Sequence, residues 1–232
     1  MTIDSTGFWL DLLEIVWVNI LLSGDNAVVI ALTARTLAPG RQRVAIVSGS
    51  AVAIALRIVL TLLAATLLSM PWLKTAGALL LLYIGVGLLA PEKSGNEPKA
   101  GGNVWGAIRT IVVADLVMSL DNVIAVAAAA HGSLVLLIVG LVLSIPLVVF
   151  GSTLLLKVIE RLPAIVWLGA ALLGFIAGGM LVEDPALAEA MSRVSQSVHA
   201  PHQTLALIAG AAGALMVVAI GKIRAMAAKP DR

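Results

Sequence analysis

Two similar polar motifs lie in strongly apolar parts of the sequence. LLSGDNAVVIA contains Asp25 and Asn26, and ninety-six residues later VMSLDNVIAVA contains Asp121 and Asn122 in the corresponding places. Carboxylate and amide oxygens suit hard divalent cations such as Mn²⁺, Mg²⁺ or Ca²⁺ better than Zn²⁺ or Cu⁺. The duplication therefore predicts that two halves of one cation site converge near the middle of the protein.

Around each motif, three polar residues are spaced i, i+4 and i+7, which places them on one face of a helix. The first set is Asn19, Ser23 and Asn26, and the second set is Asp115, Ser119 and Asn122. The predicted metal ligands are Asp25, Asn26, Asp115, Asp121 and Asn122. The predicted accessory residues are Asn19, Ser23, Ser119, Glu14 and Arg57.

Two further features belong to the first polar helix. Glu14 lies eleven residues before Asp25, nearly three helical turns away and on the same side, so we expect it nearer the outer mouth. Gly24 would allow the helix to unwind locally and to offer backbone carbonyls as additional ligands.

Arg57 is the only basic residue deep within a predicted span. A lone carboxylate at the centre of a bilayer costs at least about 2.5–3.5 kcal/mol, so buried acidic residues need a partner. One arginine can neutralise one aspartate but not Asp25, Asp115 and Asp121 together, which disfavours a purely structural role. Arg57 either pairs with one of them or acts as a coupling element that competes with the cation.

The composition is typical of a membrane protein. Of 232 residues, 60% are hydrophobic and 12% are charged, whereas soluble domains have about 45–50% and about 25%. Seven stretches without strand-like alternation are long enough to cross about 30 Å of hydrocarbon as helices, which predicts an all-α polytopic fold. The predicted spans are 8–32, 44–68, 72–90, 104–130, 134–156, 164–182 and 203–221. The absence of cysteine excludes disulfides, thiolate metal sites and a cysteine nucleophile.

The first six spans form two repeats of three helices. MPWLKTAGALLLLYIGVGLL matches LPAIVWLGAALLGFIAGGML at an offset of 92 residues. An odd number of helices per repeat inverts the second repeat, a plan common among secondary transporters. The predicted segments are repeat 1 (1–90), a cytoplasmic linker (91–103), repeat 2 (104–182), an extracytoplasmic loop (183–202), and a last helix with a cytoplasmic tail (203–232).

The distribution of basic residues predicts the orientation. Twelve Lys and Arg residues lie on one side of the predicted spans and two on the other, which places the N-terminus outside and the C-terminus in the cytoplasm. We expect the outer loop 183–202 to contain a short interfacial helix capped by Asp184, and Gly174 and Gly178 to permit close helix packing.

SGDNAVVIAL, preceded by Asn19, and ADLVMSLDNVIAVAAAA resemble the two signature helices of the TerC family, above all its short seven-helix bacterial branch. That family is related to the lysine-exporter superfamily, and members of it are implicated in manganese export. The resemblance matches Asp25, Asn26, Asp121 and Asn122 to the family's paired acidic motifs, and Asp115 to the acidic residue before the second. Glu14 corresponds to an early acidic position.

The resemblance implies a multi-pass protein of the bacterial cytoplasmic (inner) membrane that exports Mn²⁺. We expect a secondary transporter driven by protons, because no Walker motif is present, and neither an enzyme nor an organic cofactor. The expected partners are the lipid bilayer, a divalent metal ion and protons, with no nucleic acid; a homodimer remains open. The alternatives are a membrane-embedded partner or tellurite or envelope stress factor with a structural acidic pair, and an exporter of a small organic cation.

Overall fold

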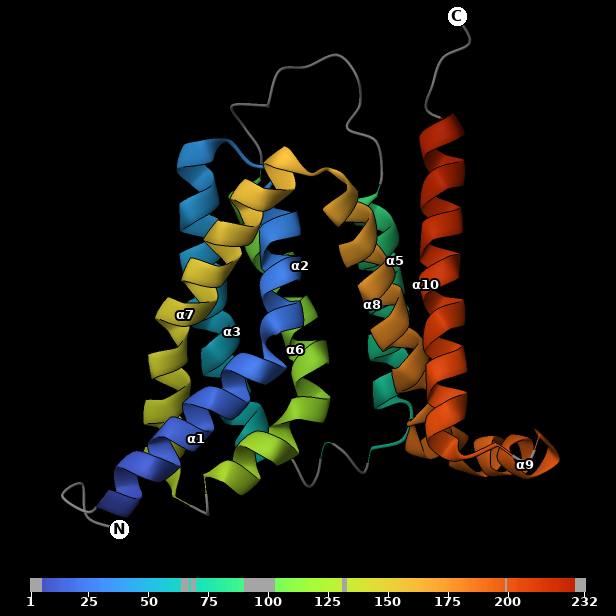
Figure 1. The fold of residues 1–232 in the computed structure, drawn as a ribbon, viewed down its shortest axis with the longest axis horizontal. Helices are drawn as coiled ribbons and strands as arrows, with labels where there is room; N and C mark the ends of the chain where they lie inside the picture. The colour runs from blue at the N-terminus through green and yellow to red at the C-terminus, as the bar shows by residue number, and fades with distance from the viewer. Residues whose placement is uncertain are drawn as a thin grey trace, which may run out of the picture. The chain divides into compact units, whose positions relative to one another are not determined.

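The computed structural model describes residues 6–63, 67, 70–89, 103–130, 133–198 and 200–227. All regular elements in this part of the chain are helices, which confirms the all-α class (Figure 1). The elements are α1 (Thr6–Leu22), α2 (Gly24–Ala34), α3 (Pro39–Leu62), α5 (Leu73–Leu88), α6 (Val104–Ala129), α7 (Leu134–Arg161), α8 (Ala164–Val182), η1 (Pro185–Leu187), α9 (Ala188–Val198) and α10 (His202–Ala227).

The first predicted span consists of two helices. α1 ends at Leu22 and α2 begins at Gly24, and the axes of Trp9–Asn19 and Gly24–Ala34 differ by 51°. The break lies where the sequence predicted local unwinding, so the prediction for Gly24 is confirmed at the level of the backbone. Ser23 is the N-terminal cap of α2, and its carbonyl accepts the backbone hydrogen bond from the N–H of Ala27 at 3.0 Å.

Several helices are suited to crossing a bilayer. Among the described residues, α3, α7, α8 and α10 are long and apolar enough, and the bent pair α1–α2 adds a fifth candidate if it counts as one span. α5 is apolar but has only 16 residues, and α6 is a helix of 26 residues. A multi-pass membrane protein is therefore supported, while seven spans and the inverted repeat remain predictions.

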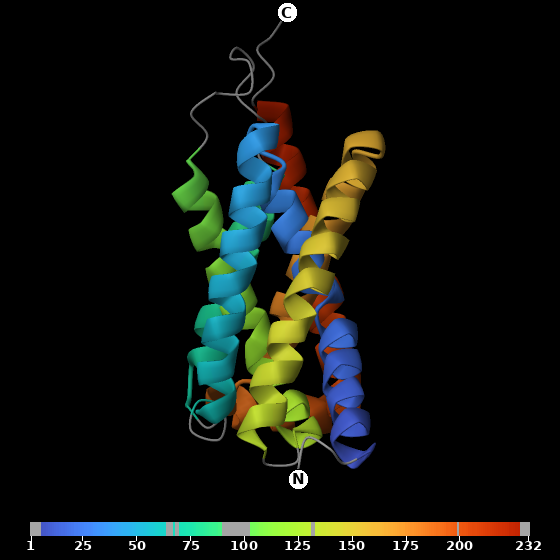
Figure 2. The ribbon, with the colours of Figure 1, turned by 90° about the vertical axis from the view of Figure 1, so that its left-hand side faces the viewer.

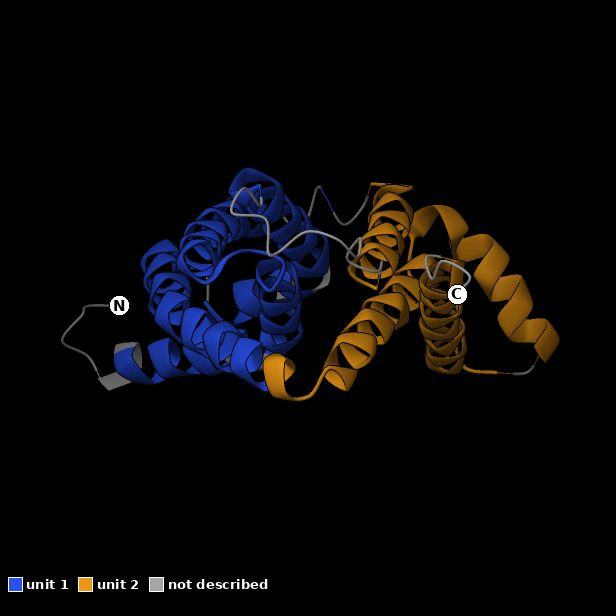
Figure 3. Cartoon of the chain, turned by 90° about the horizontal axis from the view of Figure 1, so that it is seen from above, with its two compact units in different colours: residues 1–67, 101–158 blue, residues 68–100, 159–232 orange. Residues whose placement is uncertain are grey.

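The chain forms two compact units, residues 1–67 with 101–158 and residues 68–100 with 159–232 (Figure 3). The first unit contains α1, α2, α3, α6 and most of α7, and the second contains α5, α8, η1, α9 and α10. The first two helices of both predicted repeats thus share one unit, and the third helices share the other. The segment boundaries predicted from the sequence are not tested by this grouping.

Apolar clusters occupy both ends of the first unit. One cluster contains Ile15 of α1 and Val126 of α6, and another contains Ile30 of α2 and Ile111 of α6. The residues between these positions along α1, α2 and α6 include both polar stripes predicted from the sequence. The polar residues of this unit therefore lie in a layer bounded by apolar side chains at either end.

In the second unit, α8 and α10 pack with their backbones close together. A Cβ atom placed on Gly178 would collide with the backbone carbonyl of Ala209, and one placed on Gly174 would collide with Gly213. The predicted role of Gly174 and Gly178 in close helix packing is confirmed. Such contacts rest on van der Waals packing of small residues, since the hydrophobic effect does not drive helices together in lipid.

Replacing Gly178 by Ala should destabilise the second unit by about 1–3 kcal/mol, the usual cost of inserting a methyl group into a packed contact. The matched control is Gly179→Ala, because a Cβ on Gly179 meets no atom within 4 Å. That control should be neutral or stabilising by up to about 1 kcal/mol, since Ala is the better helix former. Thermal unfolding in detergent measures both; equal midpoints for the two variants would contradict the packing.

Asp184 joins three segments of the second unit. Its Oδ1 accepts hydrogen bonds from the backbone N–H of Ala186 at 2.8 Å and of Trp72 at 2.9 Å. Its Oδ2 accepts from the backbone N–H and the hydroxyl of Thr75 at 2.8 and 2.9 Å. Trp72 precedes α5 with a left-handed φ of 68°, a conformation that these bonds help to hold. The predicted cap on the outer loop is confirmed and extends to α5.

The segment after Asp184 forms η1 and then α9, whose described side chains are not buried. Figure 1 shows α9 lying across the lower end of α10. The expected short helix in this loop is therefore present, and its location at the membrane interface remains a prediction.

Asp184→Asn should lower stability at neutral pH by about 1–3 kcal/mol, because buried N–H donors lose a charged acceptor. Burial alone would raise the pKa of Asp184, but the bonds from Thr75, Ala186 and Trp72 outweigh it and hold the pKa below 3.8. A lowered pKa gives stability that is present above the unfolded-state value and is lost as pH falls through the folded-state value.

The advantage of the wild type over Asp184→Asn should therefore vanish in strongly acidic solution. Unfolding followed from neutral to acidic pH measures this change. The control is Glu183→Gln, which removes a neighbouring carboxylate that is 47% exposed and pairs with Lys74. A constant difference between wild type and Asp184→Asn at all pH values would argue against the charged cap.

Candidate functional site

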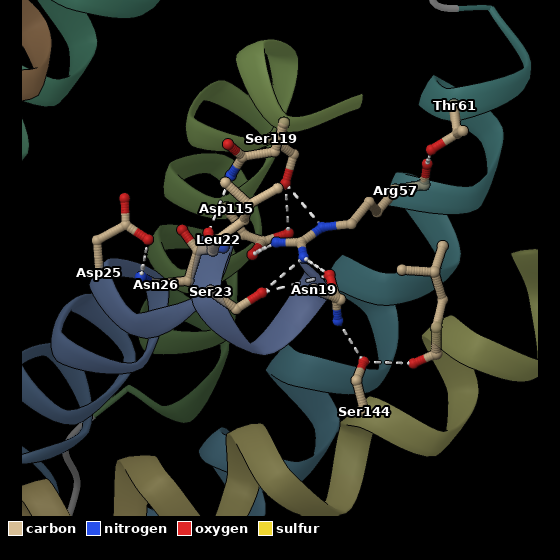
Figure 4. A network of polar contacts seen from close by, with 12 residues as sticks. Asn19, Leu22, Ser23, Asp25, Asn26, Arg57, Thr61, Asp115, Ser119 and Ser144 are labelled. Carbon is tan, nitrogen blue, oxygen red and sulfur yellow. Dashed lines mark hydrogen bonds and ion pairs between the residues drawn. The ribbon is translucent and has the colours of Figure 1, made fainter. Parts of the chain in front are cut away.

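The guanidinium of Arg57 lies at the centre of the polar layer in the first unit. Nη1 donates to Asn19 Oδ1 at 2.7 Å and to Ser23 Oγ at 2.9 Å. Nε donates to Ser119 Oγ at 2.9 Å, and Nη2 donates to Asp115 Oδ1 at 2.6 Å. Figure 4 shows these groups converging on Arg57 from both polar stripes. The arginine therefore binds the first two members of each stripe.

This ion pair is buried. Arg57 is 2% exposed and Asp115 is 6% exposed, and Ser119 Oγ donates to the second carboxylate oxygen of Asp115 at 3.2 Å. Removing two charges from water costs several kcal/mol per ion, which only close pairing and further hydrogen bonds offset. Of the two roles considered for Arg57, pairing with one aspartate is present in this conformation, and its partner is Asp115.

Asn19 extends the network to α7. Its Nδ2 donates to Ser144 Oγ at 2.5 Å, and the Ser144 hydroxyl donates to the carbonyl of Leu141 at 2.6 Å. Ser144 was not among the residues predicted from the sequence. The available signal was a polar residue two positions before Pro146, within a predicted span (134–156) that also contains Ser152 and Thr153.

The break between α1 and α2 is stabilised by the second stripe. Asn122 Nδ2 donates to the backbone carbonyl of Leu22 at 2.9 Å. An unpaired backbone carbonyl in hydrocarbon costs several kcal/mol, so a break inside a membrane-spanning helix needs such a donor. The sequence predicted that unwinding would offer backbone carbonyls to a cation. In this conformation, the carbonyl of Leu22 accepts a hydrogen bond from Asn122.

A small cavity with both polar and apolar residues in its lining lies next to the ion pair. Its polar lining consists of Ser23, Asn26, Ser50, Arg57 and Asp115. It offers about 10 Å³ to the centre of a water-sized sphere, which is about the space of one water molecule or a bare ion.

Two of the residues lining this cavity are buried without partners among the described residues. Both side-chain polar atoms of Asn26 and the hydroxyl of Ser50 have none. Buried polar groups are nearly always hydrogen-bonded, so these atoms are available for a small polar ligand. Ser50 was missed from the sequence, although it stands seven residues before Arg57 and hence on the same face of α3.

The other predicted residues lie outside this network. Asp25 is half-buried, and its Oδ1 accepts from the backbone N–H of Asn26 at 2.8 Å, turned away from Arg57 in Figure 4. Glu14 is exposed on α1. Asp121 belongs to α6, but its side chain lies outside the described part of the structure.

Within the described residues, no group of three or more His, Cys, Asp or Glu side chains could hold a metal ion. Because the side chain of Asp121 is not described, the predicted ligand set as a whole remains untested. The described oxygen donors near the cavity come mainly from amide and hydroxyl groups, with Asp115 as the carboxylate.

Comparison with protein families matches residues 4–229 to the family described as integral membrane protein TerC family. The chain belongs to the TerC family. This bears out the resemblance seen in the two polar motifs, over nearly the whole chain.

Relatives in the TerC family include an uncharacterised membrane protein of Bacillus subtilis, YjbE. It is 44% identical over 186 residues, covering 80% of this chain and 85% of that protein. The Escherichia coli protein YegH is 29% identical over 208 residues, or 78% of this chain and 38% of YegH. No solved structure matches the chain. Membership supports a role in membrane transport and leaves the substrate open.

Removing either partner of the buried ion pair should strongly destabilise this TerC-family protein. Arg57→Gln leaves Asp115 without its counter-charge, and Asp115→Asn does the same to Arg57; each should cost about 3–5 kcal/mol. The double variant should cost less than the sum of the two, because neither charge is then stranded. Arg109→Gln, which removes an exposed arginine of α6, is the control and should have little effect. Additive losses in thermal unfolding would show that the pair is not coupled.

Proposed function

We propose that this TerC-family protein is a proton-coupled secondary transporter that exports a hard divalent cation, with Mn²⁺ as its main substrate. The observation that supports this best is the cavity beside Asp115, in which the buried side chains of Asn26 and Ser50 lack hydrogen-bond partners among the described residues. We place the protein in the bacterial cytoplasmic membrane, with the N-terminus outside, as the distribution of basic residues predicts.

The chemistry of the cavity favours a hard cation. The oxygen donors that line the cavity are the carboxylate of Asp115 and the hydroxyl of Ser23, both bonded to Arg57, and the amide oxygen of Asn26 and the hydroxyl of Ser50. Oxygen donors of this kind suit Mn²⁺, Mg²⁺ and Ca²⁺, and the lining contains no sulfur or imidazole. Within this class, Mn²⁺ is chosen because members of the family are implicated in its export.

Arg57 gives this site a coupling element. In the described conformation, the guanidinium neutralises Asp115 and adjoins the cavity. A divalent cation bound to Asp115 would repel Arg57, and a proton on Asp115 would weaken its hold on Arg57. The cation and Arg57 therefore exclude each other at Asp115, and protonation of Asp115 is linked to the position of Arg57. In a transporter that alternates between two states, such competition couples the two ions.

The remaining predicted ligands belong to other stages of this proposed cycle. Asp25 bonds to the first turn of α2, and Asn122 holds the carbonyl of Leu22 at the helix break. Movement at the break would release both side chains toward the cavity. We propose that Asp25, Asp121 and Asn122 complete the ligand set when the two halves of the site rearrange.

A purely structural role is the second candidate, and one observation favours it: Asp115 is fully engaged by Arg57 and Ser119 in the described structure. On that hypothesis the polar layer only holds the helices together. An organic cation as substrate is less favoured, because the cavity has space for about one water molecule.

Asn26→Ala separates these two candidates. The side chain of Asn26 has no hydrogen-bond partner in the part of the chain that the structure describes, so its removal should leave the thermal unfolding midpoint nearly unchanged. As a cation ligand, it should be needed for transport, and we expect Mn²⁺ uptake into proteoliposomes to fall by about tenfold or more, the equivalent of losing ~1.4 kcal/mol. Mg²⁺, Ca²⁺ and Zn²⁺ are measured in parallel, with a pH gradient of either sign.

Thr33→Ala is the matched control for this experiment. Thr33 is also buried on α2, and its hydroxyl also has no partner among the residues described, but it does not line the cavity. It should transport Mn²⁺ as the wild type does. Wild-type protein that moves none of the four cations, or Asn26→Ala that moves Mn²⁺ at the full rate, would refute the proposed role.

A further inference from the structure

We propose that a groove between α3 and α7 binds an anionic phospholipid, with its phosphate at Arg43 and one acyl chain along the apolar wall. The groove has a volume of about 500 Å³ and is lined by residues of α3, including Gln42, Arg43 and Ile46, and of α7, including Pro146, Val149 and Phe150. Figure 2 shows α3 and α7 diverging toward the end of the unit where α3 begins and α7 ends. The proposal does not depend on the transported substrate.

The groove has a few polar residues in a mostly apolar lining. Gln42 and Arg43 lie on the first turns of α3, and most of the other lining residues, including Ile46, Pro146 and Val149, are apolar. Arg43 is exposed and has no ion pair within the described residues. The N-terminal end of a helix adds partial positive charge at the same place. A ligand that fits this arrangement has a negative head and an apolar tail.

The groove is poorly suited to be the path of a cation. Arg43 would repel a divalent cation in the groove. Ile46 and Val149 of the groove lining belong to one apolar cluster with Ile30 and Val148. Ile30 and Val148 line the cavity beside Asp115, so apolar side chains stand between the two spaces.

Lipid is the occupant that the surroundings supply. The chain is a multi-pass membrane protein, and Phe150 at the groove is 69% exposed, as expected for a side chain that contacts acyl chains. The guanidinium of arginine matches a phosphate through paired charge-assisted hydrogen bonds. The distribution of basic residues predicts that this end faces the cytoplasm, where anionic lipids attract basic side chains near the surface.

Native mass spectrometry of the full chain in detergent tests the proposal, with phosphatidylglycerol and phosphatidylcholine of identical acyl chains as probes. The wild type should bind phosphatidylglycerol more tightly, and Arg43→Gln should weaken that binding about tenfold while changing phosphatidylcholine binding little. Thr153→Trp, which places a large side chain in the groove, should weaken both. Arg224→Gln, which removes an exposed arginine of α10, is the matched control and should change neither.

Thermal unfolding establishes that each variant is folded, and a second measurement identifies what fills the groove. The chain has no cysteine, so Val149→Cys provides a single thiol inside the groove. It should react with a lipid-soluble maleimide, more slowly when phosphatidylglycerol is added, and hardly at all with a charged maleimide. Ser192→Cys, on the exposed face of α9, should react with both.

Three results would overturn the proposal. These are equal binding of the two lipids by the wild type, wild-type affinity of Arg43→Gln for phosphatidylglycerol, and rapid reaction of Val149→Cys with the charged maleimide. The last result would show that the groove is filled with water.

Discussion

The buried charge of Arg57 is the constraint on which the first unit depends. A guanidinium withdrawn from water must have a counter-charge and acceptors for its N–H groups, and Asp115 alone supplies only part of this. The remaining acceptors are Asn19, Ser23 and Ser119, contributed by three different segments of the chain. α1, the α1–α2 break and α6 must therefore all approach α3 at the level of Arg57.

The same constraint accounts for the broken first helix. If α1 continued straight into α2, no orphan carbonyl would be left at Leu22, and the Asn122 amide would lack its acceptor. With the bend, the two stripes supply each other's hydrogen-bond partners. Asn122 of the second stripe donates to the carbonyl of Leu22. Asn19 and Ser23 of the first stripe accept from Arg57, which pairs with Asp115 of the second. Within the described residues, Asn26 is the one stripe residue of α1 and α2 whose side chain has no partner, and it borders the cavity.

The sequence predicted the stripes because helical spacing is a local property. The i, i+4, i+7 pattern correctly placed Asn19 and Ser23 opposite Asp115 and Ser119 across one polar layer. The pattern could not predict which aspartate pairs with Arg57. Arg57 and Asp115 are 58 positions apart, and their pairing depends on how α3 packs. Ser50 and Ser144 were missed because neither belongs to the two polar stripes, and other serines such as Ser48 and Ser152 stand in the same spans. The repeat and the number of spans remain predictions, because the bend and the short α5 prevent counting spans by length.

The location of a positive charge beside the cavity changes how a cation site can work here. Two unit charges about 4 Å apart interact by about 4 kcal/mol at an effective dielectric constant near 20, and a divalent cation roughly doubles this. A cation therefore cannot simply join Arg57 at Asp115; its binding free energy must exceed that of the existing ion pair. On the proposed function, Arg57 occupies Asp115 when no cation is bound, and every cation must displace Arg57 before it binds. The arginine would then act as a built-in competitor, which prevents an empty, fully charged acidic site from ever facing the lipid interior.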